Sequence, residues 1–444
     1  MPARASTATQ TVCTQCGNAI PRVGLATVPW CTHCRWNLDA YDPAVAPYRG
    51  TKLLSRWGYR RGRQLDERLL RELGSDRSTP SAATVGSVWL MAVSALIVLL
   101  MLGCLAGVVW AWVTPHWPLG IRILASLVLF AAAAALAPRF LAVPKATRLA
   151  DGQGIELRRL VNDVAAAVGA APPDAIVFDM RVNAAVARFG WRQETLLVIG
   201  VPLWLMLTPE ARISVLAHEF GHVVNNDPMR SVLTLPARSF GARAVAATGG
   251  RNPWLRALEG AGSAAWHGGT FGGFAGIVLH AVLALVNTVG AALQLMVDSV
   301  AMPDSRRAEF LADLNAREVG GSKAFIVSSE RLLIAPGIWQ DLWDQAPRIQ
   351  PEELVTVVER SSARRSRDIG VLRQASRREV DLWSSHPCDD DRMTLVEQLP
   401  VVGPALQLGD HRWASIDAEL SQWYAHLHKT LLGTRDRIDH RPAG

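Results

Sequence analysis

Two histidines, His218 and His222, enclose Glu219 in the string HEFGH of this 444-residue chain. Residues four apart lie on one face of an α-helix, so both imidazoles can bind one metal ion while Glu219 lies beside them as a general base. This pattern is typical of zinc proteases. A bare match to five residues also arises by chance in a long chain, with the histidines only packing or capping.

The flanking residues predict the helix that this motif requires. Thr208 can cap its N-terminus, and Pro209 suits the first helical position. Apolar residues recur at helical spacing from Ile213 onward, and Pro228 cannot continue the helix. We therefore expect the histidines to share one helical face.

A catalytic zinc typically has three protein ligands and a fourth position for water, so a further ligand is needed. A histidine just downstream is excluded because Pro228 stands where it would be required. The strongest candidate is Glu309, with Asp313 one turn later able to accept the second ring N–H of a ligating histidine. The alternative is an exposed acidic face paired with Arg306 and Arg307.

Longer strings around these residues resemble a known family. VLAHEFGH followed by Asn226-Asp227, and SRRAEFLAD, are similar to the two zinc-site motifs of the HtpX-like membrane metalloproteases, which include the prenyl-protein endopeptidases. Asn183-Ala184 upstream and a Ser-His-Pro string downstream follow in the same order, so the resemblance covers about residues 140–400. It implies a gluzincin-type metalloprotease domain over 140–400, mainly α-helical with a small β-sheet.

The resemblance also implies roles for single residues. His218, His222 and Glu309 would bind a catalytic zinc, with Glu219 as the general base and Asp313 supporting a ligating histidine. These roles describe hydrolysis of a peptide bond, in which zinc polarises the substrate carbonyl and lowers the pKa of its water.

Four other residues are carried over from the same resemblance. Asn183 and Ala184 would lie on an edge strand that lines the substrate cleft, and Arg392 would be a further substrate-binding residue. His386 would help to stabilise the oxyanion and so join the catalytic residues. An edge strand can bind an extended peptide through its backbone.

Composition indicates a membrane protein. Half of the residues are hydrophobic, and only 19% are charged. This hydrophobic fraction is high for a soluble enzyme. No charged residue lies between Val85 and Val113, a run longer than the ~20 residues that span a bilayer. A second run ends at Ala137, with Arg122 near its start. We predict a transmembrane hairpin over 85–137, with buried core helices as the alternative.

The distribution of basic residues predicts the orientation. Residues 49–84, a helical or flexible linker, are basic, and Arg139, Lys145 and Arg148 follow the second run. We expect a multi-pass protein of the cell membrane. By the positive-inside rule, its N-terminus and its catalytic domain face the cytoplasm, because the basic residues lie on their side of the hairpin. Much of the formal charge of +7 then comes from basic residues beside the membrane, which are attracted to anionic lipid headgroups. Nucleic acid is the rival partner, but we expect a lipid bilayer and a polypeptide substrate. The oligomeric state is not indicated.

A third apolar stretch, residues 271–297, has several interpretations. It could span the membrane, form a hairpin within it, or be a long buried helix that leads to Glu309. Because His218 and Glu309 must meet at one ion, a single straight crossing is excluded. We therefore favour a membrane-associated helix or a re-entrant hairpin.

The N-terminal residues 1–48 carry an independent metal signal. Two Cys-x-x-Cys pairs, Cys13/Cys16 and Cys31/Cys34, have nearly the spacing of a zinc ribbon. Four thiolates would close a structural zinc site and supply folding energy to a small module. Disulfides or a redox pair are the alternatives, and a cytoplasmic location argues against disulfides.

Shorter patterns complete the prediction. Residues 182–189 and 195–200 predict a β-hairpin, and residues 351–365 and the tail 401–444 predict helices. The expected function is a membrane-embedded zinc endopeptidase, with one catalytic and one structural zinc, that cleaves membrane or membrane-proximal proteins, with quality control as one role. The alternative is an inactive membrane-anchored adaptor or sensor that binds peptides.

Overall fold

The computed structural model describes residues 12–20, 27–45, 52–75, 85–114, 117–138, 148–190, 192–225, 232–237, 239–240, 270–384 and 386–439. For most of residues 270–293 it describes the backbone alone. Several residues of the sequence analysis lie outside these ranges: Arg139, Lys145, Asn226, Asp227, Pro228 and Ser385, the serine of the Ser-His-Pro string. The chain forms two compact units, the first made of residues 1–80, 142–225 and 306–444 and the second of 81–141 and 226–305.

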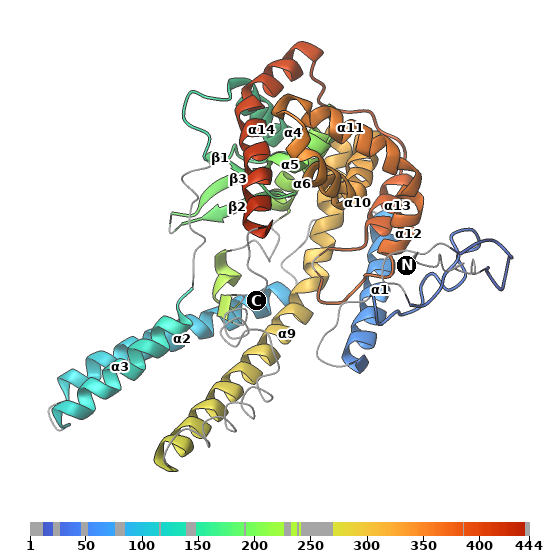
Figure 1. Ribbon diagram of the computed structural model, residues 1–444. Coiled ribbons are helices and arrows are strands. Elements are labelled where there is room, and N and C mark those ends of the chain that lie inside the picture. Colours follow the sequence, from blue (N-terminus) through green and yellow to red (C-terminus); the bar gives the residue numbers. More distant parts are fainter. Residues whose placement is uncertain are drawn as a thin grey trace. The chain divides into compact units, whose positions relative to one another are not determined.

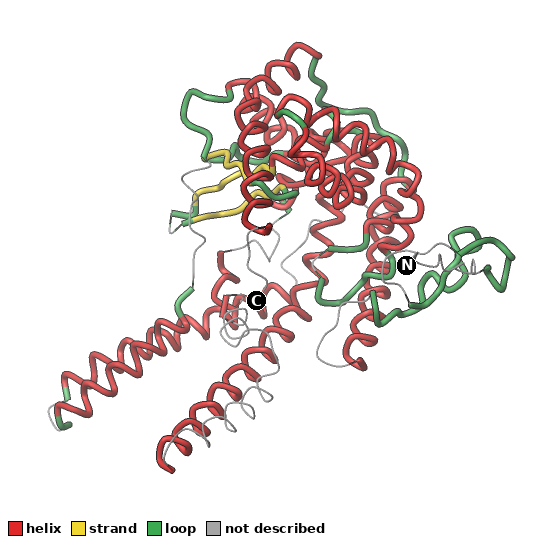
Figure 2. The backbone as a smooth tube through the Cα atoms, viewed as in Figure 1, coloured by secondary structure: helices red, strands yellow, loops and turns green. Residues whose placement is uncertain are grey.

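The first unit contains a three-stranded sheet, seen in yellow in Figure 2. Its strands are β1 (Ala175–Asp179), β2 (Ala184–Phe189) and β3 (Glu194–Gly200), in the order β1-β3-β2. β1 is parallel to β3, and β2 is antiparallel to it. The β2–β3 pair confirms the predicted hairpin, whereas β1 was not predicted. β2 lies at an edge of the sheet, where a peptide can add as a further strand.

Helices form much of the rest of the first unit (Figure 1). Besides the end of α9 (Thr270–Gly320), they are α1 (Lys52–Ser75), α4 (Ile155–Val168), α5 (Val201–Met206), α6 (Pro209–Val224), α10 (Ser322–Gln345), α11 (Leu354–Arg365), α12 (Ile369–Ser376), α13 (Asp389–Gln398) and α14 (Asp410–Asp439). α4, α6, α10 and α14 bury apolar side chains with the sheet in one core. Within this core the rings of Phe178 and Trp423 are 4.3 Å apart. The core fixes α6 against the sheet.

Helix α6 begins as the sequence predicted. The Thr208 side chain accepts a hydrogen bond from the amide of Ala211, and Pro209 occupies the first turn, where its missing N–H costs nothing. Ile213, Leu216 and other apolar residues of one face are buried in the core. The helix therefore presents His218 and His222 in a fixed orientation.

Residues 52–75 of the predicted linker form helix α1 of the first unit. Leu69 and Leu73 of α1 are buried in a cluster with Phe310, Leu395 and Leu399. Of the two forms that we predicted for the linker, the structure shows the helix over these residues. Its packing was not predicted: one apolar face is buried, as in other amphipathic helices.

The second unit holds the two apolar helices α2 (Val85–Val113) and α3 (Leu119–Leu136). Trp112 Nε1 donates to Ser126 Oγ at 2.9 Å, which joins the two helices side by side (Figure 1). Both are long and apolar enough to cross a membrane, and only 11% and 6% of their apolar windows are buried. This low burial differs from that of a core helix in a soluble protein.

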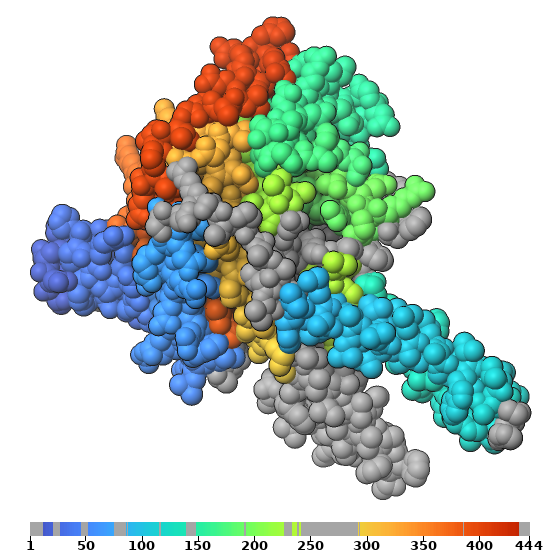
Figure 3. Space-filling view, turned by 180° about the vertical axis from the view of Figure 1, so that it is seen from behind, coloured from blue at the N-terminus to red at the C-terminus, as the bar shows by residue number. Residues whose placement is uncertain are grey.

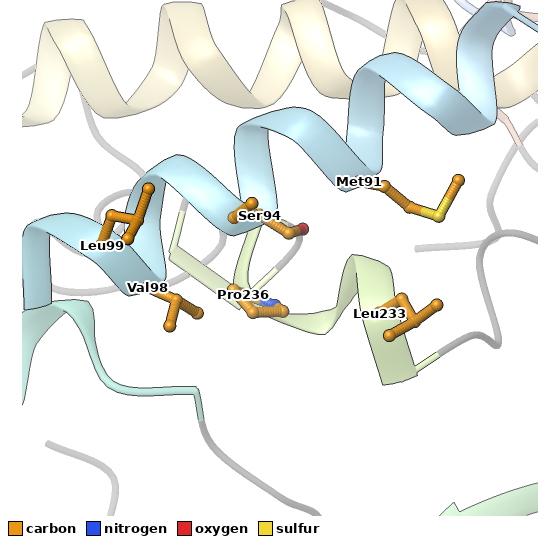
Figure 4. A pocket seen from close by; sticks show the side chains of 7 residues that line it. Met91, Ser94, Val98, Leu99, Leu233 and Pro236 are labelled. Atoms are coloured by element: carbon orange, nitrogen blue, oxygen red, sulfur yellow. The ribbon is translucent and has the colours of Figure 1, made fainter. Parts of the chain in front are cut away.

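An apolar pocket of about 500 Å³ lies in the second unit (Figure 4). α2 lines it with Met91, Ser94, Val98 and Leu99, among others. Leu233, in a short 3₁₀ helix (Val232–Thr234), and Pro236 lie opposite. The wall is almost free of polar groups, which suits an apolar environment rather than hydrolytic chemistry.

The third apolar stretch is part of one continuous helix, α9 (Thr270–Gly320). Of the two forms that we favoured for 271–297, the structure shows a helix and not a re-entrant hairpin, because no turn interrupts the helix there. Pro303 lies inside α9, although proline usually ends or kinks a helix. The helix begins in the second unit and ends in the first, where it carries Glu309.

Candidate metal centre

Two helices of the first unit, α6 and the end of α9, bring the predicted metal ligands together. His218 and His222 lie one turn apart on α6, and Glu309 lies on α9. Gly221 makes this close approach possible, because a Cβ atom there would lie 2.9 Å from Cα of Ala312 on α9. The glycine of the HEFGH string is therefore explained by helix packing.

The three side chains form a cluster with the spacing of a tetrahedral ion. Nε2 of His218 and Nε2 of His222 are 3.2 Å apart. The Glu309 carboxylate oxygens lie 3.5 Å from the first nitrogen and 3.4 Å from the second. Zinc with bonds of about 2.0–2.2 Å has its ligand atoms about 3.3–3.6 Å apart. The side chains therefore fit zinc.

Burial and hydrogen bonding support the same interpretation. His222 and Glu309 are buried, and His218 is nearly so. Oε2 of Glu309 is buried, and its neighbouring donors are distant: Nε2 of His218 lies 3.5 Å away and a terminal nitrogen of Arg392 lies 3.8 Å away. An ionised carboxylate oxygen that is buried with only distant partners is costly, and a bound cation removes that cost.

Asp313 and Arg392 support the second nitrogen of His218. Asp313 Oδ1 lies 2.9 Å from His218 Nδ1, so the carboxylate can hold the ring with Nε2 directed at the metal position. Arg392 donates from Nε to Asp313 Oδ2 at 2.9 Å and from a terminal nitrogen to Oδ1. We expected Arg392 to bind substrate, but the structure engages its guanidinium with Asp313.

The pKa values follow from this network. Burial by itself lowers the pKa of His218, but hydrogen bonds to Asp313 and Glu309 outweigh it and raise that pKa to about 9. Burial raises the pKa of Glu309, whereas hydrogen bonds with His218 and His386 hold it well below its usual value. Glu309 is thus ready to bind a cation, which must displace a proton from His218.

Glu219 lies between the two histidines on α6 and points toward the sheet. Its Oε2 accepts a hydrogen bond of 3.3 Å from the Val186 amide of edge strand β2. Ala184 begins this strand, and Asn183 precedes it with its carbonyl accepting from the Gly200 amide at 2.7 Å. The predicted base and the predicted substrate-binding strand are therefore neighbours.

His386 reaches the same cluster from the C-terminal part of the unit. Its Nδ1 lies 3.0 Å from Oε1 of Glu309, while 62% of its side chain is exposed. The structure thus brings His386 to the metal ligand with a face open to solvent. A histidine in this position can contact both the centre and a molecule that approaches it.

The exposed acidic face that we considered as an alternative is absent from this part of α9. Glu309 and Asp313 are both buried. Arg306 is fully buried as well and binds Asp66 of α1, while Arg307 lies 3.5 Å from Glu72. The sequence analysis missed the structural role of Arg306, because nothing in its local pattern distinguishes it from a surface arginine.

The four cysteines form a second cluster near the N-terminus. Sγ of Cys13 and Cys34 are 3.6 Å apart, as are those of Cys16 and Cys31, and all four lie within 4.8 Å of one another. Zinc thiolates at about 2.3 Å have sulfurs about 3.8 Å apart. The cysteines are not disulfide-bonded in the structure, and their arrangement fits a zinc ribbon.

The fold and the site can now be compared with known proteins. The sequence model of peptidase family M48 matches residues 153–399, which include α6, the end of α9 and all of α13. Comparison with curated proteins and with solved structures found no match. Because the match covers more than half of the chain, this protein belongs to peptidase family M48, the HtpX-like gluzincin family, and adds an N-terminal four-cysteine cluster to it.

Proposed function

We propose that this protein is a zinc-dependent endopeptidase whose catalytic zinc is held by His218, His222 and Glu309. The observation that carries the proposal is the cluster of three donor atoms at tetrahedral spacing in a chain of a metallopeptidase family. Three protein ligands leave one position for water or substrate, as catalytic zinc requires.

The surrounding residues suggest how a peptide bond is cleaved. Zinc bound there would act as a Lewis acid and lower the pKa of water toward ~7. Glu219 takes the proton of the attacking water and delivers it to the leaving amine. A peptide that pairs with β2 replaces Glu219 at the Val186 amide and so frees the carboxylate for this step.

His386 has the second catalytic role in this proposal. Its exposed imidazole can donate a hydrogen bond to the oxyanion that forms on the substrate carbonyl, because it stands beside the metal ligand Glu309. Asn183 and Ala184 contribute backbone and side-chain contacts to the peptide at the start of β2. Arg392 acts through Asp313 and not on the substrate.

We further propose that the enzyme is a multi-pass protein of the cell membrane, with its catalytic unit in the cytoplasm. Large apolar side chains of α2 and α3 are exposed, including Leu99 at 65% and Phe130 at 63%. A continuous exposed apolar surface of this kind marks contact with lipid. Polypeptides in or near the membrane are then the substrates, and protein quality control is one role that fits.

The four cysteines complete the proposal as a structural zinc site. They use all four positions of a tetrahedral ion, which leaves none for water. An inactive adaptor that only binds peptides is the competing function. The same residues would be present in both, so activity must be measured.

The test is cleavage of unfolded casein by the detergent-solubilised full-length protein and by Glu219→Gln. We expect the variant to keep its zinc and to lose about 10²–10⁴-fold in kcat, because only the base has changed. Glu210→Gln is the control, since Glu210 is exposed in the first turn of the same helix. Equal cleavage by wild type and Glu219→Gln contradicts the mechanism, and no cleavage by the wild type favours the adaptor.

A further inference from the structure

We propose that the N-terminal ribbon and α1 position the catalytic centre by holding one stretch of the chain, residues 377–384 and 386–392, here named the latch segment. Both holders precede residue 153, where the family match begins. The inference rests on the proposed peptidase function, since it assigns what keeps that site in shape. All of these parts belong to the first unit.

The latch segment touches the metal centre at two points. His386 Nδ1 lies 3.0 Å from Glu309 Oε1, and Arg392 Nε lies 2.9 Å from Asp313 Oδ2. Catalytic constellations tolerate errors of only about 0.5 Å. A shift of the latch segment therefore displaces the oxyanion donor and the carboxylate that orients His218.

The latch segment has little regular structure of its own. Residues 380, 381, 384, 387 and 388 belong to no helix or strand, and α13 begins only at Asp389. No ladder of backbone hydrogen bonds fixes such a stretch, so its conformation depends on contacts with its neighbours. The space-filling view shows these neighbours, the blue ribbon and α1, beside the orange C-terminal residues (Figure 3).

The ribbon holds the segment through a buried arginine. Arg378 is 1% exposed, and it donates to the Val28 carbonyl at 2.7 Å and to Asp42 Oδ2 at 3.2 Å. Burial by itself raises the pKa of Asp42. Hydrogen bonds from the amides of Val28, Thr27 and Ala44 and from the Thr27 hydroxyl outweigh burial and lower that pKa below its usual value, so Asp42 stays ionised. Removal of either partner leaves a buried charge uncompensated.

A second ionic contact joins the ribbon to the end of the segment. Arg377 donates to Asp39 of the ribbon at 3.0 Å and to Asp390 and Asp391 of α13 at 3.0 and 2.9 Å. Arg63 of α1 lies 3.1 Å from Asp39 and 3.3 Å from Asp391. The two arginines thus tie the ribbon and α1 to Asp390 and Asp391 of α13, which directly precede Arg392.

α1 holds the other side of the segment through its backbone. The Leu382 amide donates to the Gly58 carbonyl at 3.0 Å, and a Cβ atom on Gly58 would lie 2.4 Å from the Trp383 ring. Arg306, one turn before Glu309, binds Asp66 and the carbonyls of latch residues Asp381 and Ser384. The glycine lets α1 approach, and the arginine links the segment to α9.

Two substitutions displace the segment from opposite sides, each with a matched control. Gly58→Ala pushes on Trp383 from α1, and Gly74→Ala is its control because the nearest atom to a Cβ there is 3.8 Å away. Asp42→Asn breaks the ribbon contact, and Asp341→Asn is its control because Asp341 pairs with Arg364 and Arg365 of α11. If one variant fails to fold, the other still decides.

The measurements are kcat and KM on unfolded casein, together with amide hydrogen exchange of the Leu382 region, in the full-length protein. We expect both test variants to exchange faster there and to lose about 10–100-fold in kcat, with KM changed less than about twofold. The controls should match the wild type. Faster exchange with unchanged kcat overturns the inference, as does no change in either quantity.

Failure of the proposed function is distinguishable from failure of this inference. If the wild type cleaves nothing, the peptidase proposal fails, and chelator competition for the zinc at the histidine centre replaces kcat as the readout. The ribbon zinc is counted separately with a thiol reagent. A zinc affinity lowered about 10-fold by Asp42→Asn and by Gly58→Ala supports positioning, and an unchanged affinity in both overturns it.

Discussion

The two candidate metal sites of this protein differ in the type of their ligands, the number of their ligands and the residues that surround them. The cysteine cluster is built on two short turns with four equal ligands, two of which, Cys16 and Cys34, are at least partly accessible. The histidine centre is built on two long helices, with three ligands and a network of buried carboxylates and arginine behind them. The four cysteines would occupy every coordination position of a tetrahedral ion, whereas the three ligands of the histidine centre would leave one position open. The number of donors and their support therefore favour a structural role for the cysteine cluster and a catalytic role for the histidine centre.

Removal of one ligand should produce the largest difference between the clusters. We expect His222→Ala to lower bound zinc from about two ions to about one per chain and to abolish cleavage, because the centre keeps only two ligands. Metal analysis and the casein assay measure both effects. The ribbon should retain its zinc, since its ligands are independent of α6.

The matched experiment is Cys31→Ser, which should also remove about one zinc but leave measurable cleavage. Equal and complete loss of activity in both variants would contradict the purely structural role of the cysteine cluster. Retention of both zinc ions by His222→Ala would assign the metal to other residues.

Removal of support should have an intermediate effect. Asp313→Asn should weaken zinc binding about 10–100-fold, because the amide no longer fixes the His218 ring. It should also change the pH dependence. With its pKa at about 9, His218 must lose a proton when zinc binds, so the apparent affinity of the wild type falls about tenfold per pH unit below that value.

Asp313→Asn removes an interaction that raises the pKa of His218, so the affinity of the variant should become independent of pH at a lower pH than that of the wild type. Chelator competition at several pH values measures the two curves. Identical curves would contradict the role of Asp313. The ribbon provides the internal reference, since it contains no comparable carboxylate among its ligands.

A change in helix packing should have the smallest effect. Gly221→Ala places a methyl group 2.9 Å from Cα of Ala312 and should destabilise the catalytic unit by about 1–3 kcal/mol, with weaker zinc binding. Thermal unfolding measures the loss. Gly433→Ala is the control, because nothing lies within 4 Å of a Cβ there. An unchanged melting temperature would contradict this prediction, because it would show that α6 and α9 can move apart with no loss in the free energy of unfolding.

Local patterns predicted the elements of the centre well. Each of these features is encoded within a short stretch of chain: the spacing of His218 and His222, the cap at Thr208, and the acidic pair Glu309 and Asp313. Their helical periodicity therefore indicated which side chains share a face. The family resemblance supplied His386, whose contact with Glu309 spans a long stretch of chain.

The sequence could not predict the parts that depend on single distant contacts. Arg378 and Asp42 are far apart in the chain, and neither lies in a recognisable motif, so their buried pair left no local signal. The substrate-binding role of Arg392 was carried over from the family resemblance, which gave no indication of its pairing with Asp313. The sequence left residues 271–297 open between a helix and a hairpin, and it did not indicate that Pro303, a residue that normally interrupts a helix, is accommodated inside α9.

The most direct test is X-ray diffraction from the zinc-loaded full-length protein at the zinc absorption edge. The account predicts one anomalous peak among the four cysteine sulfurs and a second about 2.0–2.2 Å from Nε2 of His218, Nε2 of His222 and an oxygen of Glu309. A map with a peak at the ribbon and none between α6 and α9 would contradict the catalytic centre proposed for this protein.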